Sequence, residues 1–373
     1  MLMKVHSYLA YNGALSEKAL KLRISKDELE EAIEGAGGWS KVLFQASREA
    51  LSRESKSSAV SNGEASPTSG SFGGTELKRR RKSSGSRSST MLGTAGPADT
   101  SRDPRRLVDY SDENIWNLAN NCVDLQEELT SAGKEAVVWP ANVTYASYLD
   151  YLLIPTLVYE LEYPRTSHIR PLYLLEKTLA TFGTFFVIYA ITEHVIIPTH
   201  ESAKVNPITS NNFLAAALDQ VLPFMINYLL IFYIIFECIC NGFAELTRFA
   251  DRGFYEDWWN AVTWDEFARK WNKPVHQFLL RHVYASTIAA FRLTKFQATF
   301  VTFLLSACVH ELVMAIVSKK FRMYLFAMQM MQLPMMAIGR LPMMRKYPTL
   351  GNITFWAGLI WGFPLLAVGY LRF

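Results

Sequence analysis

Hydrophobic residues are distributed unevenly along this chain. Up to about Trp139 the sequence is polar and rich in serine, whereas beyond Tyr145 it contains apolar runs long enough to cross a bilayer, which excludes a purely soluble globular protein. Another apolar stretch, Tyr148–Leu161, is short and contains Pro155, which favours a re-entrant or interfacial segment. The runs of crossing length are Leu174–Pro198, Phe213–Cys240, Tyr284–Val317, Tyr324–Met344 and Ile353–Leu371.

The first part of the chain, residues 1–51, has the pattern of membrane-proximal amphipathic helices. Ser25 and Glu28 form an S-x-x-E capping box, which predicts the start of a short helix that Gly35 is suited to close. Met1–Ala10 has no long apolar core, so we expect no cleaved leader at this position.

Three further segments follow from composition. Residues 52–106 contain mostly Ser, Gly, Arg, Lys and Pro, and so few apolar side chains predict a disordered Ser/Arg-rich linker. Residues 107–144 are expected to form an amphipathic helix with Ser111 at its N-cap. Residues 145–373 contain the apolar runs and are predicted to be the membrane-embedded domain.

Charge and cysteine content support a membrane protein. The chain has 373 residues, 19% of them charged, and a formal net charge of +4, with basic residues in the loops beside the apolar runs. The cluster Lys78–Lys82 could be a nuclear signal, a nucleic-acid-binding arm or a basic membrane tether, and the membrane helices that follow favour the tether. Four cysteines are too few for a disulfide framework and are interpreted as small buried thiols.

Basic residues also predict the orientation. If the linker and the loop Pro164–Thr166 are cytosolic, the first crossing leaves the cytosol, the second returns, and Asn241–Val283 is a cytosolic loop. The basic cluster at 319–322 disagrees, because it would lie on the far side if Tyr284–Val317 is one simple crossing. That run exceeds the roughly 20 residues a crossing needs, so it is either tilted or broken.

Two ionisable neighbours, His310 and Glu311, lie inside an apolar run. Ionisable groups at this depth are costly, so a functional site is the default hypothesis and an inter-helix hydrogen bond is the alternative. Adjacent helical residues point about 100° apart, so both side chains cannot face one substrate on a regular helix. Ser306, four residues earlier, shares the face of His310 and is placed to orient its ring.

The polar loop after the second crossing concentrates aromatic and charged residues. Thr263 and Glu266 form a second capping box, and aromatic residues follow at helical spacing, which predicts an interfacial amphipathic helix. Lys273 precedes a proline, so the helix is predicted to end near Asn272 and to leave that amide free to turn inward. The tryptophans alternatively form an ordinary aromatic belt. The following cations either contact phosphates or are solvated interface charges: Arg248, Arg252, Arg269, Lys270 and Lys273.

Three motifs occur in the order found in one protein family. Phe254–Asn260 resembles the FYxDWWN motif of the membrane-bound O-acyltransferases (MBOATs), in their sterol and diacylglycerol branch. Trp271–His276 is similar to the W-N-x-P-V-H string of that branch, and Val309–Glu311 to its V-H-E string. The resemblance extends from about Asn114 to the end of the sequence. Met3–Tyr8 resembles a family segment that follows several earlier membrane helices, so the resemblance implies that those helices are missing here. Segments similar to the fungal sterol O-acyltransferase subgroup are Tyr159–Arg165, Thr181–Gly183 and Gln332–Pro334.

The resemblance implies an all-α polytopic membrane protein, an MBOAT-type helical bundle with an internal reaction chamber. It further implies transfer of a fatty acyl group from coenzyme A to the 3-hydroxyl of a sterol. His310 would be the general base, and Asn272 would donate a hydrogen bond to the oxyanion. Glu311 is interpreted as structural. Residues expected to bind substrate are Phe254, Tyr255, Asp257, Trp258, Trp259, Asn260, Trp271, His276, Arg269, Lys270 and Lys273.

The chemistry and the resemblance also predict the partners. Transfer from a thioester to an ester is downhill, so we expect neither a metal nor a cofactor, with acyl-CoA as a substrate. Cys308 points away from His310 on a regular helix, which favours direct transfer over an acyl-cysteine. The expected setting is the endoplasmic reticulum membrane, with acyl-CoA, sterol and membrane lipids as partners, a homo-oligomeric state and no nucleic acid. Diacylglycerol acyltransfer, or a non-catalytic transporter or sterol-sensing scaffold, stays an alternative.

Overall fold

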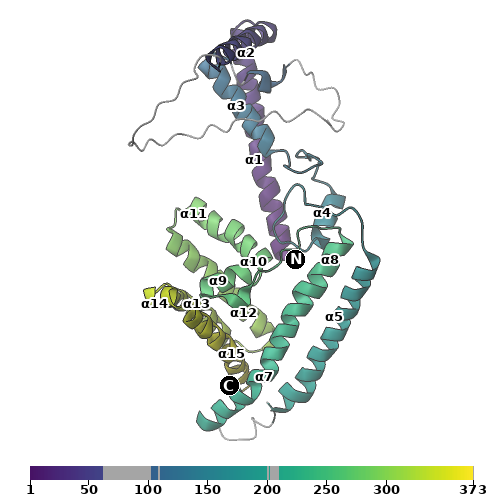
Figure 1. Ribbon diagram of the computed structural model, residues 1–373, viewed down its shortest axis with the longest axis vertical. Helices are drawn as coiled ribbons and strands as arrows, with labels where there is room; N and C mark the ends of the chain where they lie inside the picture. Colours follow the sequence, from purple (N-terminus) through teal and green to yellow (C-terminus); the bar gives the residue numbers. More distant parts are fainter. Residues whose placement is uncertain (62–101, 108–109, 200, 202–209, 373) are drawn as a thin grey trace. The chain divides into compact units, whose positions relative to one another are not determined.

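The computed structural model describes residues 1–61, 102–107, 110–199, 201 and 210–372 (Figure 1). Most of these residues are helical, and no β-strand occurs among them beyond isolated bridges. Several of the helices have membrane-crossing length, which confirms the predicted fold class of an all-α polytopic membrane protein. The chain divides into two compact units, Asn12–Val143 and a larger unit made of Met1–Tyr11 and Thr144–Phe373.

The smaller unit packs its helices around one apolar core. Its buried side chains come from α1 (Leu2–Gly35), α2 (Trp39–Ser61), η2 (Pro104–Leu107) and α3 (Glu113–Glu128). Helix α2 extends beyond residue 51, where the linker is predicted to begin, and residues 62–101 of that predicted linker lie outside the described residues. The core consists of Leu29, Ile33, Val42, Ala46, Leu107, Tyr110, Ile115, Ala119 and Cys122.

The predicted helix start at Ser25 is wrong, whereas the predicted end at Gly35 is confirmed. Helix α1 is continuous through Ser25, because residues 14–23 are mostly strong helix formers and leave no free helix end for the capping box. The helix terminates at Gly35, and the amide of Gly38 donates to the carbonyl oxygen of Ile33 at 2.8 Å, as in a Schellman-type end.

The N-cap of α3 is also one residue from its predicted position. Asp112 caps the helix, and its carboxylate accepts from the amides of Asn114 (2.9 Å) and Ile115 (3.3 Å). Ser111 instead donates its hydroxyl to Glu49 at 2.7 Å. A carboxylate is favoured at this position because it also interacts with the positive end of the helix dipole.

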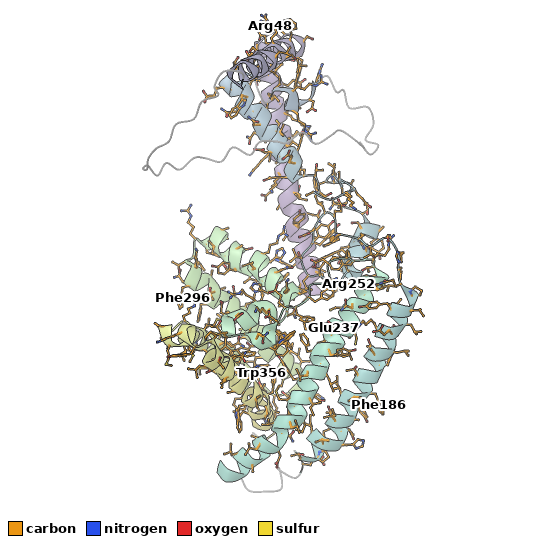
Figure 2. All side chains as sticks on the ribbon, viewed as in Figure 1. Arg48, Phe186, Glu237, Arg252, Phe296 and Trp356 are labelled. Carbon is orange, nitrogen blue, oxygen red and sulfur yellow. The ribbon has the colours of Figure 1, made fainter. Side chains whose placement is uncertain are left out.

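The larger unit contains, among its described residues, four helices long and apolar enough to cross a membrane: Pro171–Thr199, Ala217–Leu246, Lys295–Ser318 and Pro348–Ala367. Phe186 of the first and Phe296 of the third are largely exposed, as expected for side chains that face lipid (Figure 2). The elements are α4 (Tyr145–Leu153), α5 (Pro171–Ile191), η3 (Thr192–Ile196), α7 (Ser210–Phe232), η4 (Tyr233–Cys240), α8 (Asn241–Leu246), η5 (Trp258–Asn260), α9 (Trp264–Lys270), α10 (Lys273–Phe278), η6 (Leu279–Tyr284), α11 (Ala285–Phe291), α12 (Lys295–Ser318), α13 (Tyr324–Gly339), α14 (Pro342–Lys346) and α15 (Pro348–Arg372).

The sequence predicts five crossings, and two of them differ in the structure. The run Tyr284–Val317 is broken rather than tilted, because Arg292 takes a left-handed conformation (φ 53°) and Thr294 begins α12 with a capping box to Gln297. Helix α13 has 16 residues and therefore falls short of crossing length. It ends at Gly339, and Pro342 then begins the separate short helix α14.

Polar contacts hold the α5–α7 pair and the short helix α4. Asn227 of α7 donates to the Thr192 hydroxyl at 3.1 Å, an interaction that joins helices where lipid gives no hydrophobic driving force. The ammonium group of Lys4 donates to the carbonyl oxygens of Tyr151, Leu152 and Ile154 at 2.5–2.9 Å, at the C-terminal end of α4. Burial lowers the pKa of Lys4 to about 8.

Candidate active site

Residues Phe254–Asn260 form a turn whose aromatic rings build the core of the larger unit. Phe254 and Trp258 are buried, and Trp258 contacts the rings of Phe232 and Trp271 at 5.3 and 5.1 Å. Asp257, Trp259 and Asn260 are exposed at the surface of the turn. The structure therefore divides the predicted substrate-binding motif into two core residues, the half-buried Tyr255, and three surface residues.

Helix α9 begins and ends where the sequence predicts. The Thr263 hydroxyl accepts from the amide of Glu266 at 3.2 Å, and the Glu266 carboxylate accepts from the amide of Val262 at 2.9 Å rather than from the N-cap amide. The helix ends at Lys270, and the ring of Trp271 then stacks on Tyr228, with the ring centroids 4.9 Å apart.

Asn272 lies between α9 and α10 in a non-helical conformation (φ −145°, ψ 85°). Its side-chain oxygen accepts from the amide of Val275 at 3.2 Å, so Asn272 is the N-cap of α10. Because the oxygen is used in this bond, the other end of the carboxamide, Nδ2, is left as a donor without a partner among the described residues.

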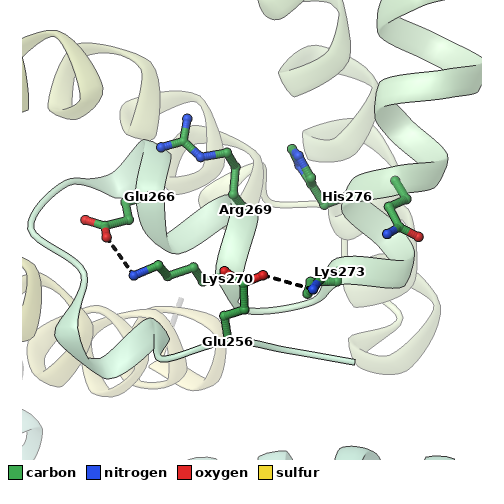
Figure 3. Close-up of a pocket in the computed structure, with 7 residues that line it drawn as sticks. Glu256, Glu266, Arg269, Lys270, Lys273 and His276 are labelled. Atoms are coloured by element: carbon green, nitrogen blue, oxygen red, sulfur yellow. Dashed lines mark ion pairs between the residues drawn. The ribbon is translucent and has the colours of Figure 1, made fainter. Parts of the chain in front are cut away.

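The cations of α9 and α10 line a cavity of about 310 Å³ (Figure 3). Arg269 pairs with Asp265 at 2.5 Å and Lys273 with Glu256 at 2.9 Å. Lys270 pairs with two carboxylates, Asp257 at 2.8 Å and Glu266 at 2.7 Å. The cavity is lined by Glu256, Glu266, Arg269, Lys270, Lys273, His276 and Gln277.

These contacts also determine the protonation states at neutral pH. The ion pair with Lys270 lowers the pKa of Asp257, and the two carboxylates around Lys270 raise the pKa of that ammonium group. Burial, together with the nearby Arg269, lowers the pKa of His276, which keeps its ring neutral at pH 7. Of the five cations predicted to contact phosphates, Arg269, Lys270 and Lys273 each form an ion pair at this cavity, and Arg252 pairs with Glu245 elsewhere.

His310 occupies an exposed position on α12. Its Nδ1 lies 2.7 Å from the backbone oxygen of Ser306, one turn earlier, and 3.4 Å from the Ser306 hydroxyl. A carbonyl oxygen only accepts, so Nδ1 is a ring nitrogen that carries a proton, and Nε2 is the nitrogen whose lone pair is free when the ring is neutral. Nε2 has no hydrogen-bond partner in the part of the chain that the structure describes. Ser306 thus orients the ring as the spacing predicts, mainly through its carbonyl group.

Glu311 is buried and hydrogen-bonded to neighbouring helices, which confirms its structural interpretation. Its carboxylate accepts from the amides of Arg322, Met323 and Phe326 at 2.7–3.2 Å, all near the N-terminus of α13. It also accepts from the Tyr370 hydroxyl of α15 at 2.7 Å. One carboxylate therefore joins α12, α13 and α15.

The structure brings Phe254–Asn260 together with α9 and Trp271–His276, but no described hydrogen bond or ion pair joins His310 to them. Sequence reasoning missed the hydrogen bond from Tyr255 to Glu237 (2.6 Å), which together with burial raises the pKa of Tyr255 to about 12. Glu237 is an ionisable residue inside the second apolar run, and this position alone could have indicated that it has a polar partner. Among the described residues, no three His, Cys, Asp or Glu side chains form a metal site.

Sequence comparison places these features in a family. The profile of the membrane-bound O-acyltransferase family matches residues 76–372. The chain belongs to this family. The chain is 44% identical over 239 residues to the probable sterol O-acyltransferase 1 of Schizosaccharomyces pombe. This match covers 64% of the chain and 44% of the length of that relative.

Two other relatives show the breadth of the similarity. The MBOAT chain is 41% identical over 272 residues to sterol O-acyltransferase 2 of Saccharomyces cerevisiae, which covers 69% of the chain and 42% of the relative. It is 31% identical over 278 residues to human diacylglycerol O-acyltransferase 1, which covers 72% of the chain and 55% of the relative. The chain thus spans about half the length of these relatives.

Proposed function

We propose that this protein transfers a fatty acyl group from acyl-CoA to the 3-hydroxyl of a sterol and releases a steryl ester and free coenzyme A. The single observation that carries the chemistry is the geometry of His310, whose Nδ1 donates to the Ser306 carbonyl and whose Nε2 has no hydrogen-bond partner among the described residues. Family membership and the names of the fungal relatives support the substrate class.

In this mechanism Nε2 of His310 accepts the proton of the sterol hydroxyl as its oxygen attacks the thioester carbonyl. The C–O bond forms, the C–S bond breaks, and the proton passes from the imidazolium to the sulfur of the departing coenzyme A. Transfer in one step needs no acyl-enzyme. Cys308 is exposed, but on a regular helix it lies about 200° around the axis from His310.

Asn272 is proposed as the donor to the thioester oxygen, on which negative charge develops in the transition state. Its capping bond to Val275 supports this role, because holding Oδ1 fixes the direction of the Nδ2 donor. Trp271 and Trp258 belong to the aromatic packing that supports this corner, so we assign them a scaffolding role in substrate binding.

The strength of each ion pair indicates which cation is free to contact a phosphate of coenzyme A. Lys270 and Lys273 are held by residues of the neighbouring turn, whereas Arg269, among the described residues, pairs only with the partly exposed Asp265 on its own helix. An exposed pair at i,i+4 is worth only about 0.3–0.5 kcal/mol, so a phosphate can replace Asp265 at little cost. We therefore propose Arg269 as the cation that contacts a coenzyme A phosphate.

Diacylglycerol acyltransfer is the second candidate, because it uses the same base and the same donor and a human relative carries that name. The higher identity to the fungal sterol enzymes favours the sterol. We further propose the endoplasmic reticulum membrane as the location and a homo-oligomer as the assembly, both by family resemblance.

The decisive experiment offers labelled oleoyl-CoA to the full chain in membranes, with ergosterol and diacylglycerol in competition. Preferential labelling of steryl ester is the expected result. Labelled triacylglycerol would instead assign the second candidate. Binding of sterol without any turnover of acyl-CoA would favour the non-catalytic transporter or scaffold.

A further inference from the structure

Asn272 is enclosed by contacts from the turn that precedes α9. The amide of Glu256 donates to the carbonyl of Lys270 at 2.9 Å, and the amide of Lys273 donates to the carbonyl of Phe254 at 3.0 Å. Two ion pairs repeat this connection through side chains: Lys270 pairs with Asp257, and Lys273 pairs with Glu256. Figure 3 shows the second of these pairs. The residues on both sides of Asn272 are therefore fixed to the same turn.

These contacts lie on both sides of the short connection between two helices that contains Asn272. The backbone of Asn272 is outside the helical region, and it connects the end of α9 to the start of α10. A connection of this kind moves freely unless its flanking residues are held. An aligned catalytic group loses about 10²-fold in rate for a displacement of about 1 Å, so holding these flanks has a direct effect on transfer.

We infer that Glu256 and Asp257 are positioning residues, which hold Lys273 and Lys270 so that the Asn272 donor stays aligned. We call the four charged residues Glu256, Asp257, Lys270 and Lys273 the clamp. The inference rests on the proposed role of Asn272 in acyl transfer. It assigns the two lysines to the protein itself rather than to coenzyme A phosphates.

The two halves of the clamp are unequal. Lys270 has a second carboxylate, Glu266, at 2.7 Å, so loss of Asp257 leaves it paired. Lys273 pairs only with Glu256 among the described residues. Glu256 is therefore the more sensitive position, although the sequence motif leaves that position variable.

The test reverses charges in the full chain reconstituted in lipid. Glu256→Lys places two cations together, and we expect kcat to fall at least tenfold while the KM for acyl-CoA changes less than twofold. The double variant Glu256→Lys/Lys273→Glu restores the ion pair with the two charges exchanged between the positions, and we expect its kcat to lie within about threefold of the wild-type value. Glu128→Lys is the matched control, because Glu128 is as exposed as Glu256 (52%) and pairs with Lys18 at 3.1 Å outside the site. Its kcat should not change.

Hydrogen exchange of the Glu256 and Lys273 amides gives a second measurement that needs no activity. Glu256→Lys should accelerate exchange at both amides at least tenfold, and the double variant should restore protection. If wild type transfers no acyl group, the proposed function fails while this measurement still tests the clamp. Unchanged exchange in Glu256→Lys would overturn the inference. So would a double variant that keeps low kcat with a raised KM, because Lys273 would then contact coenzyme A directly.

Discussion

Replacing His310 by alanine tests the proposed chemistry with little effect on folding. The ring is exposed, and its hydrogen bonds among the described residues go to Ser306 on its own helix, so truncation breaks no described hydrogen bond between helices. A bond of this type contributes about 0.5–1.5 kcal/mol to stability, so assembly and the thermal midpoint should change little. A general base, in contrast, contributes about 10²- to 10⁴-fold to the rate.

The neighbouring residue is a control with the opposite expectation. Glu311→Ala leaves the amides of Arg322, Met323 and Phe326, near the start of α13, and the Tyr370 hydroxyl without their acceptor. These groups are partly or fully buried, and a buried group left unsatisfied costs about 1–3 kcal/mol, so this variant should lose thermal stability and insertion yield. Substitutions at two adjacent residues of α12 should therefore have different effects: His310→Ala should lower the rate, and Glu311→Ala should lower the stability.

The assay measures transfer of labelled oleate from acyl-CoA to ergosterol, per molecule of correctly inserted protein. We expect His310→Ala to bind acyl-CoA normally, to melt near the wild-type temperature, and to lose at least 10²-fold in kcat. A variant that keeps more than about a tenth of wild-type turnover would refute the general-base assignment. Poor assembly with normal specific activity would point to packing instead.

Three other residues give predictions that separate binding, protonation and packing. Arg269→Gln should raise the KM for acyl-CoA several-fold with kcat nearly unchanged, as steady-state kinetics will show; an unchanged KM returns Arg269 to the solvated surface. His282 is hydrogen-bonded to the buried Ser7 hydroxyl at 2.8 Å, and burial together with neighbouring cations lowers its pKa to about 4. The unfolded chain therefore binds the proton first, so stability should rise by about 1–2 kcal/mol from pH 4 to pH 6.5 after discounting for solvent screening of the partly exposed ring, and melting curves of His282→Asn should lack this dependence. Gly351→Ala places a methyl group 2.4 Å from Val262 and should cost about 1–3 kcal/mol in thermal melts, whereas Gly13→Ala, with nothing within 4 Å, should cost far less.

The features that the sequence predicts well are those determined by neighbouring residues. Thr263 begins α9 and the helix ends before Asn272, because capping and a following proline act within a few positions. The capping-box rule failed at Ser25 because this residue lies in the middle of the continuous helix α1 and not at a helix start. The break at Arg292 carries no glycine or proline signal, so a continuous apolar run concealed two helices.

The contacts that were missed join residues far apart in the chain. Ser7 and His282 are 275 positions apart, and Tyr255 reaches Glu237 in the preceding membrane helix. The pairing of Lys273 with Glu256 depends on two segments folding back on one another around Trp271. Periodicity and motif spacing describe each segment alone, so they do not show which polar groups meet across the fold.

The environment of Arg322 changes how the orientation of the protein should be judged. Its guanidinium group donates to the carbonyl oxygens of Gly369 and Tyr370 in the last turn of α15, where the helix dipole is negative. A cation used in this way is not available to anionic headgroups, so it should be left out when positive charges on the two sides are compared. Only Lys319 and Lys320 of that cluster then oppose the orientation given by the other loops. A glycosylation or protease-accessibility tag placed after Ser318 would report directly on which side this turn lies.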